Sequence, residues 1–293
     1  MIIPMTAHRP LLDVRDLEVA YEAKGGMFRK RMTTVVKGVS FHIAPGETYG
    51  LVGESGSGKS TTGRAILRLA DIAGGTVTFD GTDVGAMGSR TPLSYRRDVQ
   101  AVYQDPGASL NPRHRVGRAV TDALKRHGIG DRASRRAKAL EVFEQVGLTA
   151  AHLDRFPSEM SGGQLQRVAI ARALVLEPRL VICDEAVSAL DLSTQSQIIN
   201  LLMDLQKESG VSYLFITHDL GVVRHISHRV GVLKLGELVE ENTTDALFEA
   251  PQHEYTRSLL AASPSSSPEG RDERRAARQQ RRVAVPSALR QAS

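Results

Sequence analysis

One glycine-rich segment, residues 53–61, restricts the possible folds of this chain more than any other part of its sequence. It reads Gly-Glu-Ser-Gly-Ser-Gly-Lys-Ser-Thr and matches the pattern G-x-x-x-x-G-K-[ST] at every fixed position. An apolar run at 48–52 precedes it and a helical pattern at 62–69 follows it, and in this strand–loop–helix order the pattern indicates phosphate binding. Glycines let a backbone wrap closely around phosphate, and the free N–H groups of a helix start attract anions. We therefore predict a phosphate-binding loop in preference to a flexible glycine turn.

Two side chains of this loop carry the chemistry that a nucleoside triphosphate requires. Lys59 supplies a positive charge for the β- and γ-phosphates, and the hydroxyl of Ser60 is a ligand suited to Mg²⁺. The other positions offer backbone N–H groups. The residues predicted to bind nucleotide are Gly53, Glu54, Ser55, Gly56, Ser57, Gly58, Lys59, Ser60 and Thr61.

The bulk composition is that of an ordinary globular protein. With 293 residues, 41% of them hydrophobic and 24% charged, the chain can bury a large core in one or two domains. We find no apolar run long enough to span a membrane, and the first residues are too short and broken for a signal peptide. The single cysteine, Cys183, excludes an internal disulfide and a metal site built from several cysteines. We expect a cytoplasmic protein with a buried, inert thiol.

The positive charge of the chain is concentrated at its C-terminal end. The net charge is +5, but residues 264–293 hold seven arginines against three acidic residues, which leaves the preceding part nearly neutral. We therefore expect no nucleic-acid partner. The segment 264–293 is rich in Ser, Pro, Arg and Gln and is predicted to be a basic, disordered tail. Contact of this tail with anionic lipid or an acidic partner is left open.

Hydrophobic periodicity predicts an α/β fold. Apolar strands that alternate with helices favour a mostly parallel sheet covered on both faces. Between about 106 and 165 helices dominate, which indicates a helical subdomain. Strands are expected at 11–21, 35–43, 48–52, 75–79, 99–102, 180–183 and 211–216, with a hairpin at 229–240, and helices at 62–69, 116–127, 132–146, 163–176 and 194–208.

Two adjacent acids, Asp184 and Glu185, follow the apolar strand at 180–183. Ligands of open α/β sheets bind at the carboxyl ends of strands, so both carboxylates are expected near the phosphate loop. We predict that Asp184 holds Mg²⁺ and that Glu185, one residue further out, orients and deprotonates an attacking water. Alone, such a pair could equally be an acidic strand end. Its position after a complete phosphate loop favours the catalytic interpretation.

Ser161, Gly162, Gly163 and Gln164 form a second helix start that is suited to an anion. Ser161 is a good N-cap, and the two glycines expose the backbone of the first turn. A capped helix without a ligand is the commoner interpretation of such a segment. However, one nucleotide does not need two distant sites on one chain, whereas a nucleotide held by another copy would use the second. Together with the Gln-Arg pair at 166–167, the segment resembles the signature motif of ABC ATPases.

The resemblance to ABC ATPases implies roles for further residues. Gln104 resembles the Q-loop glutamine, which contacts Mg²⁺ and the attacking water, and His218 resembles the switch histidine, which bonds the γ-phosphate. Asp191 resembles the D-loop aspartate, which crosses the interface between two subunits. Tyr21 is similar to the aromatic residue that stacks on adenine, with Phe28 as a nearby competitor. The ligands implied are ATP and Mg²⁺, and the implied metal ligands are Ser60, Gln104 and Asp184.

In this family two ATPase subunits face each other head to tail, and each ATP lies between the phosphate loop of one and the signature of the other. Contacts in trans are therefore implied for residues 161–164 and for Asp191. The implied fold is α/β, a P-loop NTPase with a RecA-like, mostly parallel sheet. An N-terminal antiparallel β subdomain and a helical signature subdomain complete it. We assign residues 10–263 to this ATPase domain.

Three stretches narrow the resemblance to one branch of the family. Residues 104–113, 183–191 and 251–260 resemble ATPase subunits of dipeptide and oligopeptide (peptide/nickel) importers, in particular the second, F-type, subunit. The last stretch lies in an expected C-terminal extension of about 237–263. Ala186 and Glu254 each stand where that branch usually has proline.

The function implied is that of an ATP-hydrolysing subunit that couples ATP turnover to peptide uptake from the cytoplasmic face of the membrane. The implied partners are a second ATPase subunit, either a copy or a paralogue, and two transmembrane permeases, with a solute-binding protein involved indirectly. Three alternatives are weighed against it: a soluble ABC ATPase of DNA repair or translation, a non-catalytic scaffold cassette, and an exporter. The solute stays open among dipeptides, oligopeptides, nickel chelates and glutathione.

Overall fold

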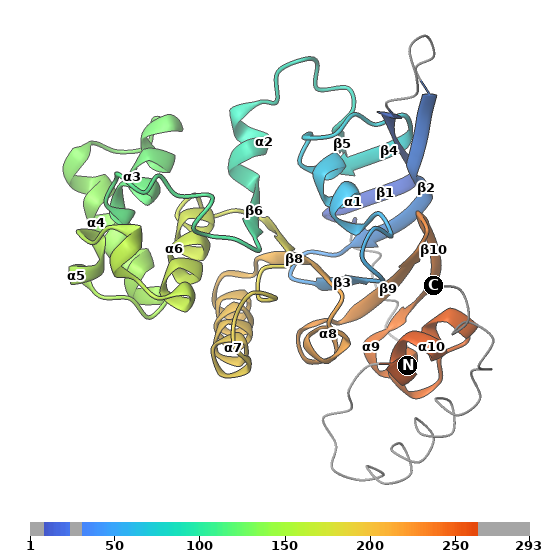
Figure 1. The fold of residues 1–293 in the computed structure, drawn as a ribbon. Helices are drawn as coiled ribbons and strands as arrows, with labels where there is room; N and C mark the ends of the chain where they lie inside the picture. The colour runs from blue at the N-terminus through green and yellow to red at the C-terminus, as the bar shows by residue number, and fades with distance from the viewer. Residues whose placement is uncertain (1–8, 24–30, 263–293) are drawn as a thin grey trace, which may run out of the picture.

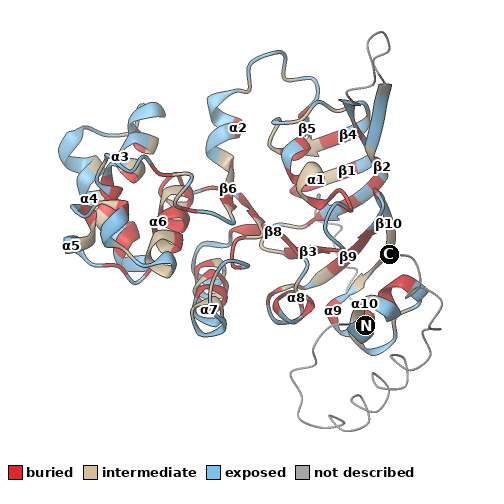
Figure 2. Cartoon of the chain, viewed as in Figure 1, coloured by how far each residue is buried: buried red, intermediate tan, exposed pale blue. Residues whose placement is uncertain are grey.

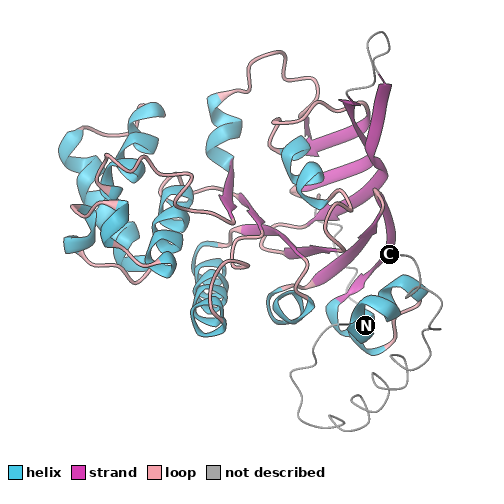
Figure 3. Ribbon diagram, in the orientation of Figure 1, coloured by secondary structure: helices cyan, strands magenta, loops and turns pink. Residues whose placement is uncertain are grey.

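The computed structural model describes residues 9–23 and 31–262. Phe28, with the rest of the loop at 24–30, and the tail expected at 264–293 lie outside these ranges. Within them the chain forms two β-sheets with helices packed around them (Figure 1; Figure 3). The strands are β1 (Leu12–Ala23), β2 (Arg31–Ile43), β3 (Thr48–Val52), β4 (Gly74–Phe79), β5 (Thr82–Asp83), β6 (Val99–Tyr103), β7 (Leu180–Asp184), β8 (Ser212–Thr217), β9 (Arg229–Lys234) and β10 (Glu237–Thr243).

The helices are of very different lengths. The α-helices are α1 (Lys59–Ile66), α2 (Leu93–Asp98), α3 (Val116–Arg126), α4 (Arg132–Gln145), α5 (Ala150–Leu153), α6 (Gly162–Leu174), α7 (Leu192–Ser209), α8 (Leu220–Ile226), α9 (Thr244–Glu249) and α10 (Glu254–Ala262). One 3₁₀ turn spans Pro157–Glu159. In the described ranges, 9–23 and 31–262, no helix has both the length and the apolar character needed to cross a membrane.

The larger sheet brings the predicted site residues to one edge. Its strand order is β10-β9-β3-β8-β7-β6, and every pairing is parallel except β9–β10, which forms the predicted hairpin. Val52 pairs with Thr217, and Asp184 pairs with Ile216. Because β3, β8 and β7 are neighbours and run in the same direction, the segments that follow them leave the sheet at the same edge.

The smaller sheet has the order β2-β1-β4-β5 and is antiparallel throughout, as predicted for the N-terminal part. Its inner face and α1 share a core with the larger sheet, which includes Leu17, Phe41, Ile66 and Leu214. The rings of Phe41 and Tyr49 stack with centroids 4.7 Å apart and join the two sheets. This shared core holds α1, and with it the phosphate loop, between two layers of strands.

The helical layer α3–α6 lies at the β6 end of the larger sheet (Figure 1). Its core continues into α7 and the sheet through residues such as Val120, Phe143, Val168 and Phe215. Buried residues concentrate on the strands and on the helix faces turned toward them, while the outer turns of α3 and α4 are exposed (Figure 2). A smaller cluster joins α8, α9 and α10 to β3 and β9.

Two features of the helices differ from expectation. Periodicity places a helix at 62–69, whereas α1 occupies Lys59–Ile66, because Gly58 caps it in the left-handed conformation and Lys59 and Ser60 form its first turn. The sequence pattern predicts no helix at α2, α8, α9 or α10. These helices are at most nine residues long, which is too short for periodicity to identify them.

Candidate functional site

The phosphate loop runs from the end of β3 into α1, and its glycines determine its shape. Gly53 has φ 151 and Gly58 has φ 107, values that other residues rarely adopt. A Cβ on Gly53 would lie 2.1 Å from the carbonyl oxygen of Leu233, so only glycine fits there. The N–H of Ser57 donates to the carbonyl oxygen of Glu54 at 3.2 Å and closes the loop.

Lys59 lies at the first position of α1 and is only 5% exposed. Its Nζ donates to the carbonyl oxygens of Gly53 and Glu54, each at 2.8 Å. Burial lowers the pKa of Lys59, and the carboxylates of Glu185 and Asp184 oppose that effect. A buried ammonium group held mainly by carbonyls can gain from an anion such as phosphate, because it keeps donor capacity to spare.

Ser60 and Asp184 meet directly across the site. The Ser60 hydroxyl donates to Asp184 Oδ1 at 2.7 Å. Burial raises the pKa of Asp184, while the hydrogen bond from Ser60 and the positive charge of Arg64 oppose that rise. With Gln104 and Glu185 they line one hollow of about 390 Å³. Hydroxyl, carboxylate and amide oxygens are the ligands that Mg²⁺ prefers, so this set of residues fits the ion.

Glu185 and His218 form a hydrogen-bonded pair at the carboxyl edge of the sheet. His218 Nδ1 and Glu185 Oε1 are 3.0 Å apart, and the His218 side chain is 63% exposed. Since an ionised carboxylate can only accept, Nδ1 is the donor. Glu185 Oε2 is buried and has no hydrogen-bond partner within the described part of the protein. The carboxylate therefore retains a free acceptor oxygen.

The backbone of Glu185 is unusual for a residue with a side chain. Its φ is 53, in the left-handed region, and its N–H donates to the carbonyl oxygen of Ile216 at 2.9 Å. Such a conformation costs on the order of 1–3 kcal/mol and persists only where the surroundings fix it. It turns the chain at the end of β7 and directs Glu185 toward His218.

One cavity of about 700 Å³ collects most of the predicted residues. It is lined by Gly53, Glu54, Ser55, Gly56, Gly58, Lys59, Ser60, Thr61, Gln104, Glu185 and His218, together with Val35 and Leu259. Tyr21 does not line it, although this residue is 40% exposed on β1 and so could still accept a flat ring from solvent. Its competitor Phe28 lies outside the described residues.

The signature segment lies apart from this cavity, at the start of α6 in the helical layer. Ser161 caps α6: its Oγ accepts from the N–H of Gln164 at 3.3 Å, and its N–H donates to Gln164 Oε1 at 3.0 Å. Ser161 and Gly162 are exposed. Within the described chain, residues 161–164 line neither hollow of the phosphate-loop side.

Asp191 is the N-cap of α7. Its Oδ1 accepts from the N–H of Thr194 at 3.0 Å and its Oδ2 from the Thr194 hydroxyl at 2.7 Å. The backbone hydrogen bond from Thr194 lowers the pKa of Asp191, and the side-chain bond adds to this. Asp191 is exposed, and the next residue, Leu192, is 80% exposed. Asp191 thus has a structural role in the chain itself, and its role in trans stays a prediction.

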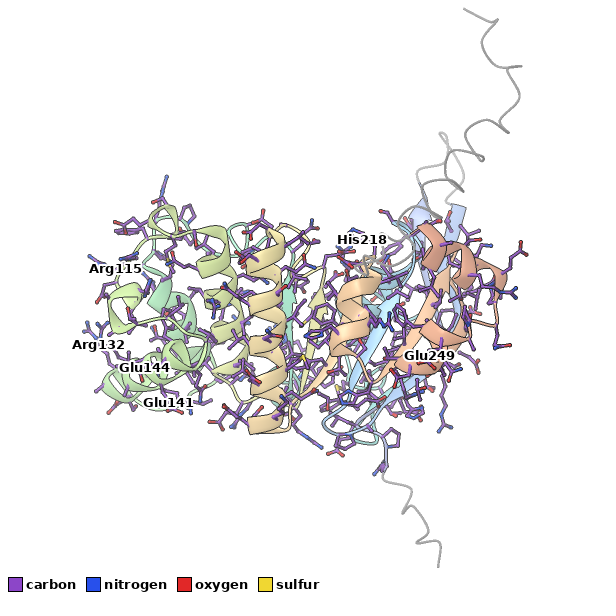
Figure 4. All side chains as sticks on the ribbon, turned by 90° about the horizontal axis from the view of Figure 1, so that it is seen from below. Arg115, Arg132, Glu141, Glu144, His218 and Glu249 are labelled. Carbon is purple, nitrogen blue, oxygen red and sulfur yellow. The ribbon has the colours of Figure 1, made fainter. Side chains whose placement is uncertain are left out.

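A separate basic hollow lies in the helical layer. It has a volume of about 410 Å³ and contains none of the predicted site residues. Figure 4 shows Arg115 and Arg132 at the end of this layer that is remote from His218. Two of the arginines that line the hollow form local ion pairs: Arg136 with Asp154 at 2.9 Å, and Arg118 with Asp122 at 3.2 Å. We attribute this hollow to packing of charged helix faces.

Sequence reasoning missed two contacts that reach the phosphate loop from the C-terminal part of the chain. The N–H of Glu54 donates to the hydroxyl of Tyr255 on α10 at 3.2 Å. The N–H of Gly236, in the β9–β10 turn, donates to the carbonyl oxygen of Ser57 at 2.9 Å. No local pattern identifies such contacts, because 201 positions separate Glu54 from Tyr255.

Comparison with known proteins identifies the family. A sequence model described as "ABC transporter" matches residues 36–188, about half of the chain. The chain belongs to the ABC transporter family. The predicted resemblance to ABC ATPases is thus confirmed, and membership in this family implies ATP binding and hydrolysis.

Curated relatives of this cassette are importer ATPases. The chain is 49% identical over 261 residues to the glutathione import ATP-binding protein GsiA of Salmonella paratyphi A and of Escherichia coli K12. The alignment covers 88% of this chain and 42% of each relative. The chain therefore spans less than half the length of the curated relatives it matches. These relatives confirm the predicted resemblance to importer ATPases.

Solved ABC cassettes confirm the predicted fold. One is cbiO1 from Clostridium perfringens, a part of the ABC transporter complex cbiONQ. Its structure compares with this chain at a TM-score of 0.72 and 26% identity, and the comparison covers 82% of this chain and 91% of that chain. The ATP-binding cassette MJ0796, in a dimeric post-hydrolysis state with ADP and Pi, has a TM-score of 0.68 at 30% identity, with 80% of this chain and 98% of that chain covered.

Proposed function

We propose that this cassette is the ATP-hydrolysing subunit of an importer, and that it works as one half of a head-to-tail pair. One observation carries the proposal. The cavity beside the phosphate loop gathers the loop, Lys59, Ser60, Gln104, Glu185 and His218, whereas the signature lies elsewhere on the chain. A second subunit would supply that missing part.

In the proposed site the chain holds the triphosphate from one side. Lys59 turns its ammonium group from the carbonyls of Gly53 and Glu54 toward the phosphates, where it gains a stronger, charged partner. The backbone N–H groups of the loop and of the α1 N-terminus surround the β-phosphate. Ser60 and Asp184, with Gln104, would hold Mg²⁺, which when bound neutralises phosphate charge.

The attacking water is oriented by the pair at the carboxyl edge. Glu185 would accept a proton of the water; its Oε2 has no hydrogen-bond partner among the described residues, and because this oxygen is buried the carboxylate would have to turn to present it to the water. His218 steadies the Glu185 carboxylate through Nδ1, and its Nε2 would donate to the γ-phosphate when the imidazole carries a second proton. Gln104 lines the same cavity and offers an amide to the water and the metal.

The second half of the site comes from the partner. Ser161, Gly162, Gly163 and Gln164 expose a helix start that would cap the γ-phosphate of an ATP held by the other subunit. Asp191 and the adjoining exposed leucine would lie at the same interface. ATP would then join two subunits, and hydrolysis would release them.

The importer assignment follows the relatives. We infer a peripheral position on the cytoplasmic face of the membrane, two permease subunits as direct partners and a solute-binding protein as an indirect one. The proposed solute is a peptide-like molecule, with glutathione and dipeptides as the first compounds to test. The paired cassette is either a copy of this chain or a paralogue.

A mixture of two damaged chains tests the shared site. Glu185→Gln destroys the proposed base but keeps the signature, and Gly162→Ala alters the signature but keeps the base. A mixed pair has one intact site, so the mixture should turn over ATP faster than either variant alone. If only an added paralogue yields turnover, the working pair is a heterodimer. The proposal would be contradicted if turnover per wild-type chain did not change on dilution and the Gly162→Ala chain turned over ATP as fast as the wild type.

Transport is tested in cells that carry the chain with its permeases. Labelled glutathione and a labelled dipeptide should accumulate inside, and the Glu185→Gln chain should abolish this uptake. Efflux of the label would instead indicate an exporter. The alternative of a soluble ATPase in DNA repair or translation predicts that DNA or ribosomes stimulate turnover, and that membranes from these cells do not retain the chain.

A further inference from the structure

We propose that Tyr255 is a positioning residue of the phosphate loop, whose hydroxyl fixes the Glu54 backbone in the shape that accepts ATP. The residue lies on α10, beyond the region matched by the family model. The inference rests on the proposed ATP site. It assigns to the C-terminal extension the role of holding the phosphate loop of that site in shape.

The contact is a tether on an exposed stretch of the loop. Glu54 is exposed, yet its N–H donates to Tyr255 Oη at 3.2 Å. The Tyr255 ring is buried, 9% exposed, in the cluster that joins α8 and α9 to the sheet. Lys234 Nζ lies 4.8 Å from the ring centroid and packs on its face. A ring held in this way keeps its hydroxyl at a defined place.

The helix that carries Tyr255 is itself anchored at its start. Glu240 on β10 accepts two backbone N–H groups with its two oxygens: Gln252 at 2.7 Å and His253 at 3.0 Å. The N–H of Tyr255 donates to His253 Nδ1 at 3.1 Å. A continuous path of hydrogen bonds therefore runs from β10 of the larger sheet through α10 to the loop.

The tether complements the contacts of Lys59. Both backbone groups of Glu54 are bonded: its carbonyl accepts from Lys59 and its N–H donates to Tyr255. When the Lys59 ammonium group turns to the phosphates, its bonds to the carbonyls weaken. The bond to Tyr255 does not involve the ammonium group and would persist. It would thus hold the first part of the loop in place while ATP binds.

Helix α10 also borders the site itself. Leu259, one turn after Tyr255, lines the same cavity as Glu54, Lys59 and Glu185. A shift of α10 would therefore move both the loop backbone and the wall of the cavity.

The test removes one hydroxyl from the full chain. Tyr255→Phe should raise KM for ATP about three- to tenfold, as expected for the loss of one neutral hydrogen bond, with kcat within about twofold of wild type. Hydrogen exchange measured without nucleotide should show a protected Glu54 amide in the wild type and faster exchange of that amide in the variant.

Tyr213→Phe is the matched control. The Tyr213 hydroxyl is also buried and donates to the carbonyl oxygen of Leu202 at 3.1 Å, but Tyr213 pairs with Thr48, at the end of β3 opposite the loop. This variant should leave KM unchanged. Equal KM for Tyr255→Phe and wild type, or an equal rise in both variants, would overturn the inference. If Tyr255→Phe does not fold, an unprotected Glu54 amide in the wild type would overturn it. A wild type that does not bind ATP would instead refute the proposed function.

Discussion

The phosphate-loop side and the signature side of the proposed site differ in how many contacts within the chain hold their residues in place. On the first, Lys59, Ser60, Asp184, Glu185 and His218 are bonded to one another or to the loop backbone. On the second, Ser161 bonds to Gln164 of its own cap, Gln164 also contacts His152 on α5 at 3.4 Å, and Ser161 and Gly162 face solvent. On the first side, both the packing of the fold and the proposed reaction therefore restrict which residues can be present. On the exposed part of the second side, the fold restricts them little.

This difference separates two adjacent glycines of the signature. A Cβ on Gly163 would lie 2.5 Å from Thr194 Cγ2, so the Thr194 side chain would have to move to admit alanine there. A Cβ on Gly162 would meet nothing closer than Leu190 Cδ2 at 3.9 Å. The fold leaves room for alanine at Gly162, and a need for glycine there would come from a ligand outside the chain.

The largest effect is expected on the phosphate-loop side. Glu185→Gln should lower kcat by about 10²- to 10⁴-fold, the range of a lost general base, because an amide accepts no proton. The side chain keeps its size, so ATP binding should survive and ATP-bound dimers should accumulate. Turnover assays and gel filtration with and without ATP measure the two effects. Near wild-type turnover would rule out Glu185 as the base.

The two signature glycines give the next prediction. Gly162→Ala should lower turnover about tenfold or more, with Tm and ATP affinity of the isolated chain unchanged. Gly163→Ala should lower turnover and Tm together, because the added methyl group displaces Thr194. Thermal unfolding measured beside turnover distinguishes them. A large drop in Tm for Gly162→Ala would remove the contrast between the two halves.

The smallest effect concerns stability and pH. Burial raises the pKa of Asp184, so the folded chain binds this proton more tightly than the unfolded chain. At neutral pH the ionised group therefore lowers the free energy of unfolding, and this penalty diminishes as pH falls through the raised pKa. Asp184→Asn should accordingly raise Tm by about 2 °C at pH 7, less at acidic pH, while abolishing Mg²⁺-dependent turnover. A lower Tm at pH 7 would contradict this account.

The sequence predicts the parts of this site that are local in the chain. The loop, the acids after β7 and the capped start of α6 each have a short pattern with a physical cause, and the strand order then brings the first two together. The left-handed backbone of Glu185 has no such signal, because glutamate rarely adopts it. The tether from Tyr255 depends on how α10 packs against β9 and β10, which no pattern at either end of the contact encodes. The roles of Tyr21 and Asp191 stay predictions, since they depend on a nucleotide and on a second subunit.

The only cysteine of the chain has a practical consequence. Cys183 is fully buried in β7, and burial raises the pKa of its thiol to about 12, so it stays protonated and inaccessible to maleimides at neutral pH. A cysteine introduced at an exposed position such as Leu192 would then be the single reactive thiol, without prior removal of the native one. Spin or fluorophore pairs attached there could report the distance between two subunits during each cycle of ATP turnover.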